Sequence, residues 1–214
     1  MARVRVTGFT IVELLIVIAV IGVLAVIATV IYSGFQERAM NTSRVSAARS
    51  FVQAIEMYTA EHGRIPGDPL AYGSCLGRNS ANICNGVSTA DIAAGRDSQP
   101  DPVLDAELLT VISKIPKVPD RPVVPNESWY TPREAIGPIL LESSDRFVNG
   151  QLVPWAVHFW LQGTNIPCGL AVLRDMGWDA VEGRVIYEQG VESSYTISQA
   201  GTTECIVPLQ APQT

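Results

Sequence analysis

Charged and apolar residues divide the chain into a long apolar stretch near its start and a mixed remainder. From Leu14 to Ile31 the sequence runs for 18 residues without a charge. A helix of that length can cross the hydrocarbon core of a bilayer. The pattern predicts a helix buried in an apolar environment, followed by a water-soluble portion.

Polar residues return after Gln36, but apolar residues keep the spacing of a helix. They recur at intervals of mostly three or four residues, at Met40, Val45, Ala48, Phe51, Val52, Ile55 and Tyr58. This spacing places an apolar stripe along one side of a helix. Gly63, with Pro66 soon after it, is a typical stop signal.

These two patterns join into one expected helix over residues 9–62. Its first part, residues 9–35, would lie in the apolar environment, and residues 36–62 would pack their stripe on the soluble domain. Gly22 or Gly34 could interrupt it, and the alternative is therefore an anchor followed by a separate amphipathic helix.

Residues 63–150 are rich in proline and predict a long loop with short helices. Ten of the 14 prolines lie here, and proline interrupts regular structure. One helical pattern runs from Leu104 to Ile115. A second could start at Thr131, before Pro132, and reach about Glu142.

Strand patterns dominate residues 151–214. Alternating residues from Trp155 to Gln162 predict a strand, and shorter candidates span Arg184–Glu188, Ser194–Ser198 and Glu204–Leu209. Leu170–Met176 could form a small helix before a glycine. The expected fold is α+β, with a long N-terminal helix packed on a C-terminal antiparallel sheet.

Four cysteines follow the apolar stretch, and none belongs to a C-x-x-C pair. An even number in an exported portion favours disulfides over zinc. We expect Cys75–Cys84 and Cys168–Cys205, although Cys75 could also pair with Cys168 or Cys205.

Candidate chemistry elsewhere is sparse. Both histidines, His62 and His158, fit structural roles, and no hydrolase, phosphate-binding or paired metal motif occurs. We therefore expect neither an enzyme nor a resident cofactor. One loop gathers oxygen ligands that could bind calcium, namely Asn79, Asn82, Asn85, Asp91 and Asp97. The net charge of −6 argues against nucleic acid as the main partner.

The first residues give the strongest signal. Arg3 and Arg5 precede the apolar stretch, and positive charge tends to remain on the cytoplasmic side. Glu13 stands at the edge of that stretch, where a carboxylate in a bilayer helix is costly and rarely lacks a role. A secretory signal peptide or a plain anchor has no use for it. The alternative is that Glu13 merely lies at the level of the lipid headgroups.

The segment Gly8-Phe-Thr-Ile-Val-Glu13-Leu-Leu-Ile-Val-Ile resembles the cleavage and methylation motif of type IV pilins and type II secretion pseudopilins. Glycine precedes the cut, an apolar residue follows it, and glutamate is the fifth mature residue. The resemblance implies that residues 1–8 are a leader, cut after Gly8 by a membrane aspartyl prepilin peptidase. The same enzyme would methylate the new amine of Phe9 with S-adenosylmethionine.

The resemblance also implies a function, partners and a location. The chain would be a structural subunit of a type IV pilus or of a related secretion or competence filament, with Phe9 and Glu13 acting in assembly. Its partners would be identical or related subunits, the peptidase, an inner-membrane assembly platform and membrane lipid. It would first be a single-pass inner-membrane protein with a cytoplasmic N-terminus. The alternative is an anchored, exported binding protein that never polymerises.

Overall fold

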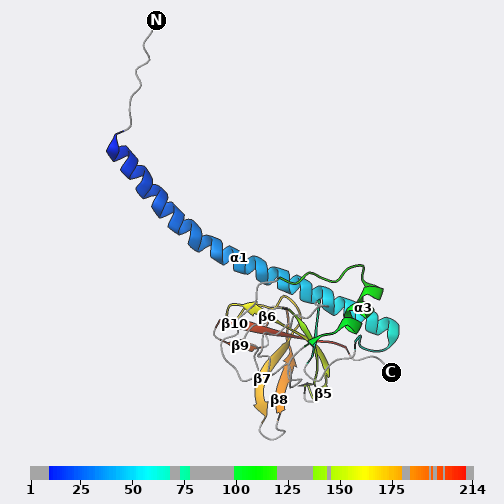
Figure 1. Cartoon of the computed structure of the whole chain (residues 1–214). Coiled ribbons are helices and arrows are strands. Elements are labelled where there is room, and N and C mark those ends of the chain that lie inside the picture. The colour runs from blue at the N-terminus through cyan, green and yellow to red at the C-terminus, as the bar shows by residue number, and fades with distance from the viewer. Residues whose placement is uncertain are drawn as a thin grey trace. The chain divides into compact units, whose positions relative to one another are not determined.

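The computed structural model describes residues 10–67, 73–77, 99–119, 137–143, 146–179, 184–192, 194, 197–199 and 201–210. The contacts between residues divide the chain into two units, residues 1–39 and residues 40–214. The long helix α1 (Ile11–His62) contributes to both, as Figure 1 shows. The prediction of one helix is confirmed, because neither Gly22 nor Gly34 interrupts it.

The second unit contains a six-stranded sheet. Its strand order is β2 (Gln99–Pro100), β1 (Ser74–Cys75), β3 (Ile139–Glu142), β6 (Trp155–Gln162), β10 (Thr202–Pro208) and β9 (Ile197–Gln199). All described pairings are antiparallel except the short parallel pair β1–β2. The expected strand from Trp155 to Gln162 is confirmed as β6.

A second sheet of four strands lies in the same unit. Its order is β5 (Gln151–Leu152), β4 (Phe147–Val148), β8 (Arg184–Gln189) and β7 (Leu173–Asp179). The β4–β8 pair is parallel and the others are antiparallel. The chain therefore has the expected α+β fold with a long N-terminal helix, but it forms two sheets where one was predicted.

The main core lies between the C-terminal part of α1 and the six-stranded sheet. Phe51 and Ile55 of α1 are completely buried, as are Phe159 and Leu161 of β6, so the predicted stripe packs as expected. Gly77 has a positive φ of 78° and passes so close that a Cβ there would lie 2.8 Å from Phe51 Cζ. Only glycine satisfies both conditions.

Strand β6 is buried on both faces. Its other face contributes Ala156 to a smaller cluster with Val148, Leu173 and Ile206, which joins the two sheets. This double burial explains why β6 is apolar at nearly every position, as a central strand must be.

The helix expected from Leu104 to Ile115 is shorter than predicted. It is α3 (Pro102–Val111), capped by the Asp101 carboxylate, which accepts hydrogen bonds from the Val103 and Leu104 amides. Ile112 is extended, with φ −125° and ψ 146°. Pro116 also disfavours helical geometry at the residue before it. The apolar spacing therefore continues to Ile115, beyond the end of the helix at Val111.

Two other predicted helices are wrong where the structure describes them. Ile139–Glu142 forms β3, because it pairs with β6 in the centre of the larger sheet. Leu173–Asp179 forms β7, because Leu173 fills the core between the sheets and the strand pairs with β8. Residues 131–136 lie outside the described residues.

Candidate functional site

The start of α1 is closed by a reciprocal pair of side chains. The Glu13 carboxylate accepts hydrogen bonds from the Thr10 amide at 2.8 Å and the Thr10 hydroxyl at 2.7 Å. The Glu13 amide in turn donates to the Thr10 hydroxyl at 3.3 Å. This is a capping box, with Thr10 as N-cap and Glu13 at the third helical position. The Thr-x-x-Glu spacing could have shown it in the sequence, and sequence reasoning missed it.

Capping gives Glu13 a role that needs no second chain. Helix N-termini also attract negative charge, so the carboxylate is stabilised where it stands. Gly8 and Phe9, the residues expected at the cut, lie outside the described residues. Their expected roles, and a pairing of Glu13 with the Phe9 amine, stay predictions.

An uncovered apolar surface follows the cap. The window Ile11–Ala28 has a mean hydropathy of 3.1, and none of it is buried. By length and composition this helix is able to cross a membrane. Leu14, Ile21 and Leu24 are each more than half exposed. An exposed apolar surface of this extent is typical of a site that contacts a membrane or other proteins.

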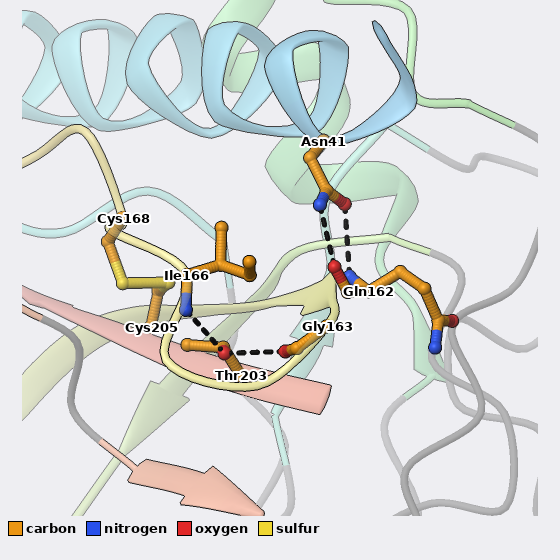
Figure 2. Close-up of a disulfide and its surroundings, with 7 residues drawn as sticks. All are labelled: Asn41, Gln162, Gly163, Ile166, Cys168, Thr203 and Cys205. Atoms are coloured by element: carbon orange, nitrogen blue, oxygen red, sulfur yellow. Dashed lines mark hydrogen bonds between the residues drawn. A yellow bond between two sulfur atoms is a disulfide. The ribbon is translucent and has the colours of Figure 1, made fainter. Parts of the chain in front are cut away.

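Asn41 fastens α1 to the larger sheet within the second unit. Its side-chain amide donates to the Gln162 carbonyl at 2.8 Å and accepts from the Gln162 amide at 3.0 Å, as Figure 2 shows. The Arg44 guanidinium donates to the same Asn41 oxygen at 3.1 Å. The signal for this contact was a poor helix former, Asn, inside a helix.

The segment after β6 is held to β10 beside this contact. A disulfide joins Cys168 to Cys205 across a sequence separation of 37. The Thr203 hydroxyl accepts from the Ile166 amide at 3.0 Å and donates to the Gly163 carbonyl at 2.7 Å. Cys75 is also disulfide-bonded, while Cys84, its expected partner, lies outside the described residues.

The histidines serve structure in the described part of the chain. His158 is buried between Arg146, 3.0 Å from its Nε2, and Glu204, 2.9 Å from its Nδ1. Burial lowers the pKa of His158, and Arg146 lowers it further, against the opposing effect of Glu204. His62 stacks on Tyr58 with ring centroids 4.0 Å apart.

No group of three or more metal-ligating side chains forms among the described residues. The asparagines and aspartates that could bind calcium, at positions 79–97, lie outside them. Calcium binding therefore stays a proposal based on sequence.

Parts of this sequence are similar to known proteins. Residues 3–29 match the family described as the prokaryotic N-terminal methylation motif. A fimbrial protein of Neisseria meningitidis serogroup B is 33% identical over 94 residues, which cover 41% of this chain and 55% of the relative. The type IV major pilin protein PilE of Neisseria gonorrhoeae is 34% identical over 90 residues, covering 39% and 54%.

The fimbrial protein EcpC of Eikenella corrodens is 36% identical over 92 residues, covering 39% of this chain and 60% of the relative. The chain thus spans little more than half the length of the curated relatives it matches, and no solved structure matches it. The methylation motif and part of the sequence are therefore similar to those of fimbrial proteins and type IV major pilins.

Proposed function

We propose that this chain is a structural subunit of a type IV pilus or of a related secretion or competence filament. The observation that carries the proposal is the uncovered apolar surface of α1, interrupted by one carboxylate, Glu13, within the methylation motif. A bilayer covers this surface before assembly, and the α1 helices of neighbouring subunits cover it in the filament. The folded second unit remains in water in both settings.

Maturation would prepare the N-terminus for the transfer of α1 from the bilayer to the filament. Prepilin peptidase cuts after Gly8 on the cytoplasmic side and methylates the Phe9 amine, and an inner-membrane assembly platform then takes up the subunit. Cleavage creates a positive amine four residues before Glu13, a spacing that would place both on one helix face if the helix extended to Phe9 after the cut. The carboxylate can then exchange its bonds with Thr10 for the Phe9 amine of its own chain or of a neighbour.

The second candidate function is an anchored, exported binding protein. The apolar helix alone would serve such an anchor equally well. Helix capping by Glu13 would serve an anchor as well as a filament subunit. What separates the two functions is whether Glu13 also pairs with the Phe9 amine, which only a filament subunit needs. A filament subunit also needs Gly8, whereas an anchored receptor tolerates its replacement.

The decisive experiment is N-terminal mass analysis of protein recovered from sheared surface filaments. A mature chain beginning at methylated Phe9 supports the proposal, and full-length protein found solely in membranes contradicts it. Gly8→Val should leave the precursor uncut. An unchanged yield of mature protein from this variant would refute the assigned cleavage site.

A Glu13→Ala variant tests the assembly role directly. It should insert and be cleaved, because cleavage precedes any contact with a neighbour, but it should enter filaments poorly or lack the methyl group. Val12→Ala is the matched control, since it alters the same turn without removing a charge. Expression without wild-type chain prevents rescue, and the result is measured per subunit incorporated. Normal incorporation and methylation of Glu13→Ala would favour the anchored binding protein.

A further inference from the structure

The hairpin formed by β4 and β5 is closed at its base by one buried side chain, that of Arg146. The Arg146 guanidinium donates to the Pro154 carbonyl at 3.0 Å and, at a longer distance of 3.5 Å, to the Val153 carbonyl. The Val153 amide donates back to the Arg146 carbonyl at 2.8 Å. The two strands pair at two positions, and so short a hairpin is marginally stable by itself. The hairpin therefore depends on what holds Arg146.

His158 of β6 ties Arg146 to the larger sheet. The Arg146 guanidinium lies 3.0 Å from Nε2 of His158, and Nδ1 of His158 lies 2.9 Å from the Glu204 carboxylate of β10. Arg146 is 4% exposed and His158 is 7% exposed. Because a guanidinium has no acceptor, Nε2 must be unprotonated and accept from Arg146, while Nδ1 carries the proton and donates to Glu204. The contact therefore requires a neutral imidazole.

A second proton on His158 is incompatible with this arrangement. It would bind at Nε2, where it would face the Arg146 guanidinium and place two buried positive charges side by side. Burial is the main cause that lowers the pKa of His158 below its ordinary 6.5, Glu204 opposes this effect, and Arg146 adds to it. Release of Arg146 into water removes the repulsion, so protonation and release occur together.

Other titratable side chains on this side of the sheets come from the second sheet. Tyr187 of β8 packs against the cluster that joins the sheets, and Asp175 of β7 lies opposite it in the strand register and is exposed. On the larger sheet, β3 places an apolar residue, Ile139, opposite His158. Among the described residues, the charges that shift the pKa of His158 are the guanidinium and the carboxylate that contact its ring.

We infer that His158 is an acid-sensitive latch, which holds the β4–β5 hairpin on the larger sheet while its imidazole is neutral and releases the hairpin when its imidazole is protonated. Release withdraws Val148 of β4 from the cluster that it forms with Ala156, Leu173 and Ile206. Acid therefore opens the contact between the two sheets at this edge, while the main core on the opposite face of β6 stays packed. The inference concerns the second unit alone and does not depend on filament formation.

The direction of the pH effect follows from the lowered pKa. A released, hydrated imidazole binds a proton near the ordinary pKa of 6.5, whereas the latched imidazole binds it at a lower pH. The latch is therefore closed above this value and opens progressively as the pH falls below it. Because release takes up one proton, the equilibrium constant for opening should rise by up to about tenfold for each pH unit.

Hydrogen exchange of the Val153 amide tests the latch in the full chain in detergent. The result is expressed as a protection factor, which removes the ordinary pH dependence of amide exchange. We expect the protection of this amide to fall about tenfold between about pH 6.5 and pH 5. The Gln162 amide at the far end of β6 donates to Asn41 and should keep its protection. An equal fall at both amides would mean global unfolding and would overturn the inference.

Replacement of each histidine separates the latch from other effects of acid. His158→Gln offers a carbonyl oxygen to Arg146 but takes up no proton, so the protection of the Val153 amide should become independent of pH. His62→Gln is the matched control, since His62 is the other histidine of the chain, and it should behave as wild type. A fall in His158→Gln as large as that in wild type would contradict the latch.

Two further measurements apply if His158→Gln does not fold. Nitrogen NMR of wild-type chain labelled at histidine should show, at neutral pH, a His158 ring protonated at Nδ1 and not at Nε2. Arg146→Met removes the tie itself, so it should lower the protection of the Val153 amide already at neutral pH and reduce its dependence on acid. A ring protonated at Nε2 at neutral pH, or unchanged protection in Arg146→Met, would overturn the inference.

Discussion

The two parts of α1 are both helical, but their apolar side chains are exposed in the first part and buried in the second. Between Ile11 and Ala28 apolar side chains surround the helix and remain exposed. Beyond Met40 the helix is amphipathic, and Phe51, Ile55 and Tyr58 are buried against the soluble domain. A helix that is apolar all round needs a surrounding apolar medium, whereas a helix with one apolar stripe needs one packed face.

This difference separates substitutions that affect folding from substitutions that affect the proposed assembly. Substitutions in the amphipathic part remove contacts that the isolated subunit already makes, so they reduce its stability. Substitutions in the apolar part change side chains that the chain by itself leaves exposed, so under the proposed function they affect contacts with lipid or with other chains. The same chemical change should therefore have a large effect on unfolding in one part and almost none in the other.

The largest expected effect is that of Phe51→Ala. Phe51 is fully buried in the main core, and truncating such a side chain typically costs about 3–5 kcal/mol. Ile21→Ala, at a position 59% exposed, should leave the stability of the second unit within about 0.5 kcal/mol. Denaturant unfolding in detergent can be followed by tryptophan fluorescence, because all four tryptophans follow α1. Equal effects of the two variants would contradict the division.

Removal of the Cys168–Cys205 disulfide comes next. A loop closed over a separation of 37 residues corresponds to about 3–4 kcal/mol in the chain-entropy account. Cys168→Ala with Cys205→Ala should lower stability by that order, because it frees the segment after β6. The same unfolding measurement, with and without reductant, checks it. A wild type that loses no stability on reduction would refute this expectation.

Much of the fold was predictable because apolar residues recur in the sequence at helical or strand spacing. The stripe from Ala48 to Tyr58 and the strand at Trp155–Gln162 are each long enough to show their period. The helix predicted at Leu170–Met176 was wrong, because a short apolar segment fits a helix and a strand equally well. Leu173 packs in the core between the two sheets, and no local sequence pattern reveals that contact.

The candidate site shows the same limit. Gly8 and Glu13 could be identified because the motif is contiguous. The partner of Asn41 could not, because Gln162 lies 121 residues away in the sequence.

A smaller effect is expected at Asn41. Asn41→Ala leaves the amide and carbonyl of Gln162 without their side-chain partner, and unsatisfied buried polar groups cost about 1–3 kcal/mol. Ser43→Ala, exposed in the same helical turn, should change stability by less than about 0.5 kcal/mol. Hydrogen exchange of the Gln162 amide provides a local measurement. Unchanged protection of that amide in Asn41→Ala would show that the contact is not formed.

The smallest expected effect is the acid sensitivity due to Glu107. Its carboxylate accepts bonds from Arg64 and from the Gly67 amide, tying the segment after α1 to α3. The Arg64 guanidinium lowers the pKa of Glu107 below its ordinary 4.5. A carboxyl whose pKa is lowered by folding stabilises above its unfolded pKa, and this contribution disappears as the pH falls through the folded value.

Glu107→Gln should therefore flatten the acid side of the stability profile and change little at neutral pH. The Arg64 side chain is 53% exposed, so water and salt weaken the pair, and added salt should shrink the difference between variant and wild type. Glu142→Gln, at an exposed carboxylate of β3, is the matched control. A profile of Glu107→Gln identical to wild type at low salt would show that this ion pair adds nothing. In that case apolar packing rather than this ion pair would stabilise the segment after α1, as it does the second part of α1.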